Sequence, residues 1–314
     1  MKKYFILAAA AIAMASCSND EGTSVANDGT IRLTTDVSKA GTRTIDQTIQ
    51  ATQIVNGGRV FAEFTSSVAA DATSPATGWA ASQTTATATY TADGSGNLNG
   101  ATVKFPDDGA TVSVRAWYPN FAAVPVITGG SETVVSVQAD QSTEANYAVS
   151  DYLYGTSSSF VKADIANPIK IYFQHMLSKI NVKVTKSDGS SLVGAKVVFG
   201  AADDMYLDGK LGTGYSVATT GTTQGTVTMA TALDAAGTAS CIIIPQTLTS
   251  GKDLITITDA EGKNYTYKLA DNKTFAEKKA YTYNVTIAEE GVIILSEQIT
   301  EWEYETPESV IAKE

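Results

Sequence analysis

The sequence predicts an all-β fold of two tandem antiparallel β-sandwich domains. Segments of alternating apolar and polar residues recur at regular spacing along the 314 residues, and clusters of Gly, Asn, Asp and Ser separate them. Long amphipathic helical stretches are absent from the sequence. The strand-like segments fall on two halves of similar size, so each half is expected to form one sandwich.

The first residues predict a leader that ends in a lipid anchor. Lys2 and Lys3 precede an apolar run, residues 4–15, which at about 12 residues is far shorter than the roughly 20 of a membrane-spanning helix. Residues 14–17, Met-Ala-Ser-Cys, then read as a lipobox. We expect residues 1–16 to be a signal peptide, Cys17 to carry acyl chains such as palmitate, and residues 17–29 to be a flexible tether. An ordinary signal peptide with an accidental cysteine is the alternative.

In the first half, the predicted strands are short and joined by turns. Ile31, Leu33, Thr35 and Val37 alternate with polar residues, which is the period of a half-buried strand. An exposed loop is expected at residues 39–44. Further strands are predicted at residues 59–64, 84–92 and 111–118, and the Gly-rich segment 93–97 indicates the turn of a hairpin.

The middle of the chain predicts a domain boundary and a change of direction. A Tyr- and Ser-rich stretch separates the halves, so we expect the N-terminal sandwich to span residues 30–165 and the C-terminal sandwich residues 166–314. In the run from 168 to 185, the apolar residues sit first at odd and then at even positions. One flat strand cannot bury both sets on the same face, so a bulge or short turn is expected near His175–Lys179.

The second half predicts a series of short strands. The strongest alternation places Tyr281, Tyr283, Val285 and Ile287 on one face. The predicted strands cover residues 193–199, 215–218, 226–229, 238–244, 253–258, 264–269, 280–288 and 291–299.

Composition excludes several classes of function. The net charge is −11 and no cluster of Lys and Arg follows the leader, so nucleic acid is not an expected partner. After lipidation of Cys17, the one remaining cysteine is Cys241, which rules out an intramolecular disulfide. Cys241 lies in an apolar, strand-like run, so a buried and inert thiol is expected.

No set of residues predicts an enzyme, a cofactor or a metal site. The single histidine, His175, lies in an apolar run, which favours a structural role over catalysis. Asp93, Ser95 and Asn97 have the alternate spacing of a calcium loop, but Leu98 stands where the loop glycine should be, so a hairpin tip is favoured. Aromatic residues could stack on sugars, although those in strands more often belong to a core; the tryptophans are Trp79, Trp117 and Trp302.

Several segments together resemble the fimbrillin family, the lipoprotein-exported pilins of type V pili. Residues 151–155, Asp-Tyr-Leu-Tyr-Gly, and 173–180, Phe-Gln-His-Met-Leu-Ser-Lys-Ile, are similar to the most specific family passage. Looser likenesses, in the family's order, are the first strand with its loop up to Arg43, the segment 105–119, the strand 279–287 and the closing Ile299-Thr-Glu-Trp302.

This resemblance implies a fold and a mechanism. It implies two transthyretin-like β-sandwiches, no enzymatic activity, and a structural role in a pilus, or fimbria, that supports adhesion at the cell outer membrane and cell surface. It also implies that an arginine-specific protease cuts after the first strand. Arg43 is the favoured site because Gly41 and Thr42 suggest an accessible loop; Arg59 and Arg32 are the alternatives.

Loss of the first strand would make the chain a receptor for a strand of another subunit. Removing Ile31, Leu33 and Val37 would leave an unpaired strand edge and an apolar trench. Donor-strand exchange would fill that trench, with a donor expected within residues 291–314. The candidate donor residues are Val292, Ile293, Ile294, Leu295, Val310 and Ile311.

Two questions stay open at this point. The expected partners are other pilus subunits in a homopolymer or with tip and anchor subunits, together with the protease, the outer membrane through the lipid anchor, and host glycans or proteins. Stalk, tip and anchor roles are all compatible with the sequence. The rival interpretation is a monomeric surface lipoprotein that binds glycans, because the same leader, sandwiches and aromatic residues fit it.

Overall fold

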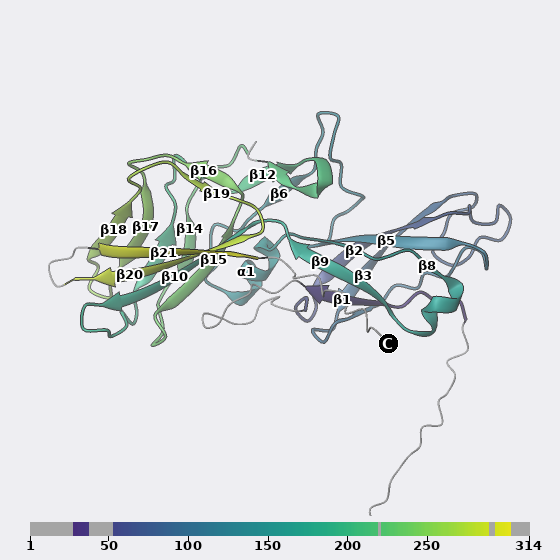
Figure 1. Ribbon diagram of the computed structural model, residues 1–314, viewed down its shortest axis with the longest axis horizontal. Coiled ribbons are helices and arrows are strands. Elements are labelled where there is room, and N and C mark those ends of the chain that lie inside the picture. Colours follow the sequence, from purple (N-terminus) through teal and green to yellow (C-terminus); the bar gives the residue numbers. More distant parts are fainter. Residues whose placement is uncertain (1–27, 38–52, 219–220, 289–292, 303–314) are drawn as a thin grey trace, which may run out of the picture.

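The computed structural model describes residues 28–37, 53–218, 221–288 and 293–302, and it shows two β-rich parts lying end to end (Figure 1). The first part contains β1 (Leu33–Val37), β2 (Arg59–Ser66), β3 (Thr85–Ala92), β4 (Asn97–Asn99), β5 (Thr111–Tyr118), β7 (Leu153–Thr156), β8 (Phe160–Val161) and β9 (Ile169–His175). A 3-10 turn, Lys162–Ala166, joins the last two of these strands.

The second part holds the remaining elements. They are β6 (Val134–Ser136), α1 (Glu144–Ser150), β10 (Ser178–Lys186), β11 (Lys196–Phe199), β12 (Asp208–Leu211), β13 (Val217–Ala218), β14 (Val227–Ala230), β15 (Thr238–Ile243), β16 (Gln246–Leu248), β17 (Asp253–Thr258), β18 (Asn264–Lys268), β19 (Lys273–Phe275), β20 (Lys279–Ile287) and β21 (Ile293–Glu301), with a 3-10 turn at Thr213–Tyr215. The all-β prediction is confirmed.

The first part is one 8-stranded sheet that closes on itself. Its strand order is β2-β3-β4-β1-β9-β7-β5-β8, and β2 also pairs with β5 along the opposite edge. The sheet therefore forms a ring, which leaves β8 as a short addition to β5. The inward side chains of this ring make a continuous core that includes Ile31, Leu33, Phe64, Val114 and Phe173.

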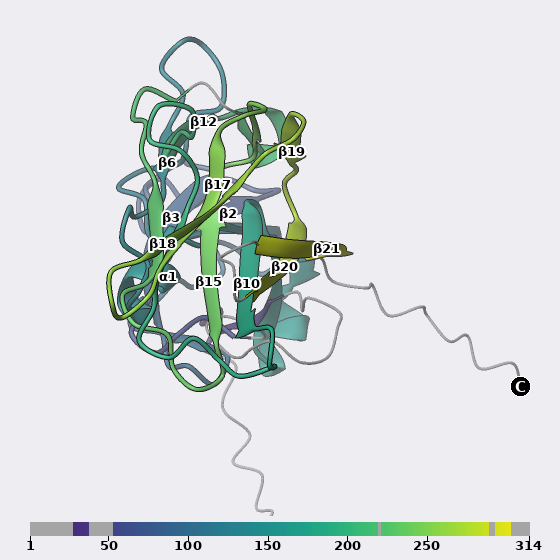
Figure 2. The ribbon, with the colours of Figure 1, turned by 90° about the vertical axis from the view of Figure 1, so that its left-hand side faces the viewer.

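The second part is built of several smaller sheets around a second core. Two sheets have four strands each, in the orders β15-β10-β20-β21 and β14-β11-β17-β18, and smaller sheets join β13-β12-β6 and β16-β19. Seen end-on, the strands of these sheets surround a common interior (Figure 2). That interior is filled by residues such as Val182, Phe199, Ile255 and Val285.

The change of apolar register in the long central run marks the passage from one part to the other. β9 ends at His175 in the first sheet, Met176 and Leu177 are both buried, and β10 begins at Ser178 in the second part. The expected turn near His175–Lys179 is confirmed. Its physical reason is that the two halves of the run bury their apolar faces in different cores.

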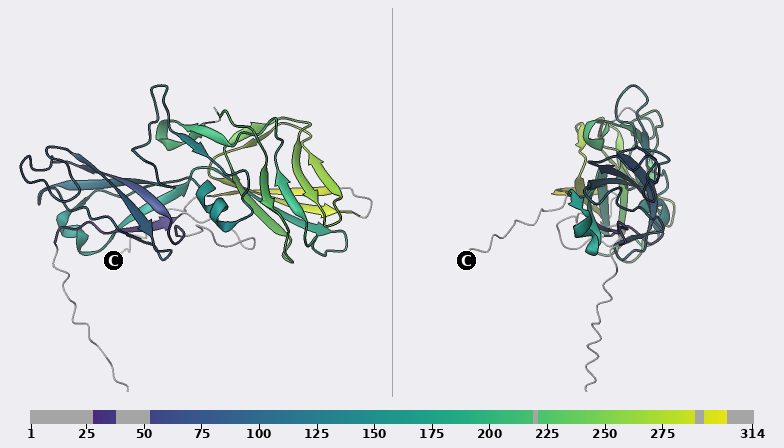
Figure 3. Two further views of the ribbon diagram at one scale, coloured as in Figure 1. Left: turned by 180° about the vertical axis from the view of Figure 1, so that it is seen from behind. Right: turned by 90° about the vertical axis from the view of Figure 1, so that its right-hand side faces the viewer.

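The chain passes between the two parts more than once, as the view from behind also shows (Figure 3). Val135, Val137 and Tyr147 precede β7 but pack in the second core. Conversely, Ile171 and Phe173 of β9 belong to the first core. The domain limits at 165 and 166 stay a prediction, and the cores show that each part draws on both sides of that limit.

Most predicted strands appear within a few residues of their expected bounds. The hairpin at residues 93–97 is confirmed, with β3 paired to β4 across the turn. The helix α1 was not expected from the sequence; its N-terminus is capped by the Thr143 side chain, which accepts a hydrogen bond from the Asn146 backbone N–H. Among the described residues, no helix has the length and apolar character to cross a membrane.

Candidate functional site

Strand β1 completes the ring of the first part. It pairs antiparallel with β4, where Leu33 lies opposite Leu98, and parallel with β9 along its whole length, from Leu33 opposite Ile169 to Val37 opposite Phe173. Because β1 is the strand between β4 and β9, the ring is closed at this point only while β1 is in place.

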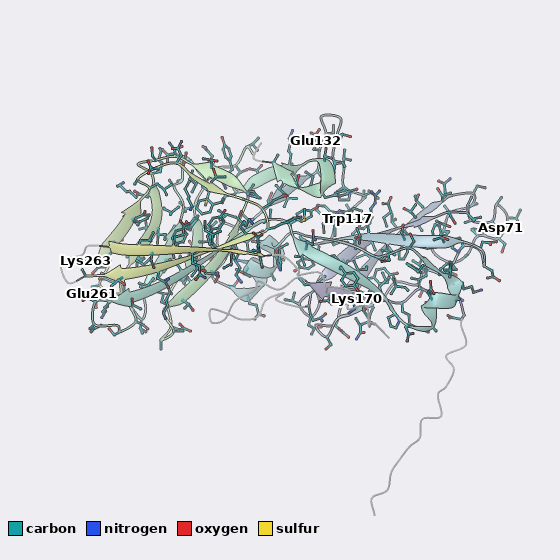
Figure 4. All side chains as sticks on the ribbon, in the orientation of Figure 1. Asp71, Trp117, Glu132, Lys170, Glu261 and Lys263 are labelled. Atoms are coloured by element: carbon teal, nitrogen blue, oxygen red, sulfur yellow. The ribbon has the colours of Figure 1, made fainter. Side chains whose placement is uncertain are left out.

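The side chains of β1 alternate strictly between core and surface. Leu33, Thr35 and Val37 of β1, and Ile31 two residues before it, are all at most 4% exposed. Burial of each aliphatic side chain contributes about 1.5–3 kcal/mol. On the outer face, Asp36 of β1 forms an ion pair with Lys170 of β9, with 3.4 Å between the charged atoms; Figure 4 labels Lys170 beside β1. This first strand therefore supplies a complete stripe of the first core.

Backbone hydrogen bonds hold β1 on both edges. The N–H of Ile31 donates to Val103 and that of Thr35 donates to Gly96 on one side, at 2.8 and 2.7 Å. On the other side, the N–H of Ile169 donates to the carbonyl of Arg32 at 2.8 Å. Loss of β1 would leave donors and acceptors on both neighbouring strands without partners, next to an apolar trench.

The last strand of the described chain is an edge strand of quite different character. β21 pairs with β20 over its 9 residues and has no partner on its other edge among the described residues. Its side chains from Ser296 to Ile299 are exposed, and Ile299 is 51% exposed. From Ser296 to Ile299, β21 is thus held by backbone pairing and by the ion pair of Glu297 with Lys273 rather than by burial of its side chains.

Directly after β21, three residues from distant parts of the chain meet where the two cores adjoin. Nδ1 of His175 lies 3.0 Å from each carboxylate oxygen of Asp151, and both side chains are 1% exposed. The His175 ring stacks on Trp302, with 3.8 Å between ring centroids. The backbone N–H of Trp302 donates to Lys278 at 2.7 Å. These contacts fix the end of β21 against the end of β9.

A second cluster joins the two parts through aromatic rings. Trp117 of β5 lies in the middle of the molecule (Figure 4), with its ring centroid 5.3 Å from that of Tyr215. Arg115 forms an ion pair with Glu63 and places its guanidinium over the rings of Trp117 and Tyr215, at 5.7 and 5.8 Å. The hydrogen bond to Glu63 raises the pKa of Arg115, so this cation stays charged.

Comparison with known proteins gives the family. The model of the fimbrillin-like family matches residues 42–302. The chain belongs to the fimbrillin-like family. No match is found among curated proteins.

Two solved structures share the fold of this chain at low identity, and a third is less similar. A protein of Bacteroides ovatus proposed to act in cell adhesion is 19% identical with a TM-score of 0.61, covering 88% of this chain and 99% of that one. A similar protein of Bacteroides uniformis is also 19% identical, with a TM-score of 0.58 and coverage of 88% and 98%. The C-terminally truncated tip fimbrial protein Mfa3 of Porphyromonas gingivalis is 12% identical, with a TM-score of 0.46 and coverage of 87% and 100%.

The arginines of this fimbrillin-like chain differ in their surroundings. The sequence holds four: Arg32, Arg43, Arg59 and Arg115. Arg32 lies between the buried residues Ile31 and Leu33, and its carbonyl accepts a backbone hydrogen bond. Arg59 is paired with Thr91 on the neighbouring strand. Arg115 is paired with Glu63 on one side and with Thr156 on the other. Arg43 lies outside the described residues, as do Cys17, Val292, Val310 and Ile311. Ile293, Ile294 and Leu295 lie in β21.

The residues considered for sugar stacking, calcium binding or thiol chemistry are buried or form part of a turn. Trp79, Trp117 and Trp302 are 6%, 0% and 4% exposed, so no tryptophan face is open to a sugar. Asp93 accepts hydrogen bonds from the side-chain amide of Asn97 and from the backbone N–H groups of Ser95 and Asn97, which lower its pKa and define a hairpin turn. Burial raises the pKa of the Cys241 thiol. Among the described residues, no three His, Cys, Asp or Glu side chains gather as metal ligands would.

Sequence reasoning did not foresee the meeting of Asp151, His175 and Trp302. Each of the three residues lies in a segment that resembles the family. The sequence signal for the cluster was therefore the occurrence of an aspartate, the single histidine and the closing tryptophan within these family-like segments. Their spatial convergence depends on pairing between strands far apart in the chain.

Proposed function

We propose that this chain is a structural subunit of a cell-surface pilus, exported as a lipoprotein on Cys17 and polymerised by donor-strand exchange after cleavage at Arg43. The family membership supports a pilus role. The single observation that carries the mechanism is the position of β1: it is a central strand of a closed sheet, yet it is contributed by the first described segment of the chain.

The position of the arginines supports cleavage after Arg43. Proteases bind their substrates with an accessible backbone, and the backbones of Arg32, Arg59 and Arg115 are engaged in strand pairing or interstrand hydrogen bonds. A cut between β1 and β2 separates the first strand from the rest of the chain and leaves every other described strand intact. The cut at Arg43 meets this requirement.

Release of β1 gives polymerisation its driving force. The strand is held by ladder hydrogen bonds and by a stripe of buried side chains, so its loss exposes an edge and a trench of the same shape. A strand of another subunit restores both contacts. Since donor and acceptor surfaces differ, the contact repeats head to tail and grows a filament.

The test uses the mature protein and an arginine-specific protease. We expect a new N-terminus at Thr44, followed by SDS-resistant ladders on a gel. Arg43→Ala should prevent both, whereas Arg59→Ala should change neither. Ladders from the Arg43→Ala protein, or a folded monomer that persists after cleavage and loss of residues 17–43, would contradict the proposal.

A further inference from the structure

A cavity of about 640 Å³ lies where helix α1 of the second part faces the first part (Figure 1). Its first wall is the turn 55–59 that leads into β2, and its second wall is the end of β5 with Pro119 and Asn120. Its third wall is one face of α1, from Glu144 to Val149. Small-molecule sites in proteins have volumes of roughly 300–1,000 Å³, so the size of this cavity suits a small ligand.

Backbone hydrogen bonds and small residues keep this cavity open. The N–H of Gly57 donates to the carbonyl of Ala92 at 2.9 Å, and the N–H of Ala92 donates to Gly58 at 2.8 Å, which fixes the turn to β3. Gly57 has a φ of +80°, which favours glycine, and a Cβ added there would meet no atom within 4 Å. The facing helix contributes the short side chains of Ala145 and Ala148. A ligand would therefore enter a site that is already formed.

Polar side chains line the cavity from all three walls. Arg59 and Glu144 lie on different walls, and neither forms an ion pair or a side-chain hydrogen bond with another residue in the described part of the chain. Asn56 and Asn120 add two amides. The carbonyl oxygen of the Asn120 side chain accepts a hydrogen bond from the Thr89 hydroxyl at 3.1 Å, which leaves its amide N–H groups as donors. The cavity thus offers one cation, one anion and two amides.

These groups favour a ligand that has a carboxylate, hydroxyl groups and an apolar patch. The guanidinium of Arg59 can hold a carboxylate through two parallel N–H donors. The carboxylate of Glu144 accepts hydrogen bonds and cannot donate them, so it favours hydroxyl or amide N–H groups and disfavours an ion such as phosphate. Val55, Pro119 and Ala145 give the cavity an apolar lining against which a methyl group can pack. An acidic sugar that carries an N-acetyl group has all of these features.

We propose that this cavity binds a sialic acid, the N-acetylated acidic sugar at the end of a surface glycan. Its carboxylate binds Arg59, its hydroxyl groups bind Glu144 and the two asparagines, and its acetyl methyl group packs on the apolar lining. The chain has a net charge of −11, which repels anions in general, so affinity for an acidic sugar must arise from a local cation. This site goes beyond the proposed function, since it belongs to the single subunit and needs neither cleavage nor strand exchange.

The first test compares three sugars, titrated into the mature, uncleaved protein and followed by NMR. The methyl glycoside of N-acetylneuraminic acid carries both the carboxylate and the N-acetyl group, glucuronic acid carries only the carboxylate, and N-acetylglucosamine carries only the N-acetyl group. We expect the first sugar to bind more tightly than either of the others, and about tenfold or more tightly than N-acetylglucosamine, because charge-assisted hydrogen bonds to the guanidinium are lost in the neutral sugar. No binding of the first sugar, or equally tight binding of the neutral one, would overturn the proposal.

The second test assigns the binding to the cavity. Arg59→Gln should weaken binding of the acidic sugar by about tenfold and leave N-acetylglucosamine binding nearly unchanged, since only the carboxylate uses the guanidinium. Arg32→Gln is the matched control, because Arg32 is also exposed and does not line the cavity. Equal binding of the acidic sugar by these two variants would refute the role of Arg59 and with it the proposal.

A third variant fills the cavity. Ala145 is exposed on α1, so Ala145→Trp should leave the fold intact, which thermal unfolding checks, and should weaken binding of all three sugars. A folded Ala145→Trp protein that binds the acidic sugar like the unchanged protein would place the sugar elsewhere and overturn the proposal.

The outcomes are distinct from those of the proposed function. Binding of the acidic sugar by a protein that forms no ladders after cleavage would support this site and contradict strand exchange. Ladders from a protein that binds none of the three sugars would support strand exchange and contradict this site.

Discussion

The imidazole ring of His175 stacks on the indole ring of Trp302, with centroids 3.8 Å apart and 12° between the ring planes. His175 ends the last strand of the first sheet, and Trp302 follows the last strand of the second part. The ammonium group of Lys179 lies 5.8 Å from the indole centroid. This stack therefore ties the end of β21 to the junction between the two cores.

Removal of the Trp302 ring should destabilise the whole chain. Trp302 is 4% exposed, and truncation of a buried tryptophan to alanine typically costs about 3–5 kcal/mol. We expect Trp302→Ala to lower the free energy of unfolding by that amount, measured by urea denaturation. Trp302→Phe keeps an aromatic ring on His175 and should lose clearly less; equal losses for the two variants would show that the stack is not the source of the effect.

Asp151 should stabilise the folded chain through the hydrogen bond that it accepts from His175. Nδ1 of His175 lies 3.0 Å from the carboxylate, and neither side chain reaches solvent. Asp151→Ala leaves a buried ring N–H without an acceptor, which costs about 1–3 kcal/mol. Asp151→Asn retains a carbonyl oxygen and should cost less. The denaturation midpoints of the two variants give the comparison, and an Ala variant as stable as the Asn variant would refute this reading.

Gly155 should not tolerate a side chain. A Cβ at this position of β7 would lie 2.8 Å from the side chains of Ile171 and Phe173 on the neighbouring strand. Gly155→Ala should therefore lower the free energy of unfolding by about 1–3 kcal/mol, because the added methyl group overpacks the core. Gly212 is a matched control, since its φ is −119° and an added Cβ would come no nearer than 3.8 Å to another residue. The packing argument would be contradicted if Gly212→Ala unfolded at a lower temperature than Gly155→Ala.

The strands of this fold could be predicted because their alternation is local. The pattern from Ile31 to Val37 predicts both the strand and the face that it buries. The switch from odd to even apolar positions around His175 even indicates where the chain leaves one core for the other. The helix α1 escaped prediction because it is short, with 7 residues, and is held by the Thr143 cap and by burial of Tyr147.

The arrangement of the candidate site could not be derived from the same patterns. The closure of the ring through β2 and β5, and the insertion of β1 between β4 and β9, are pairings between segments distant in sequence. Alternation gives each strand the same signal whichever neighbour it has. The same limit explains why Asp151, His175 and Trp302 were recognised in separate motifs and not as one cluster.

The ion pair between Arg115 and Glu63 should couple the two parts of the molecule. The side chain of Glu63 is 8% exposed, while that of Arg115 is 39% exposed and covers Trp117 and Tyr215. Arg115→Met keeps the packing stem but leaves the Glu63 carboxylate without its cation, so we expect a loss of about 1–3 kcal/mol in the free energy of unfolding. Adding Glu63→Gln should recover part of this loss, because the buried charge is then gone. Urea denaturation of the two single variants and the double variant measures this coupling, and strictly additive losses would show that the two side chains act independently.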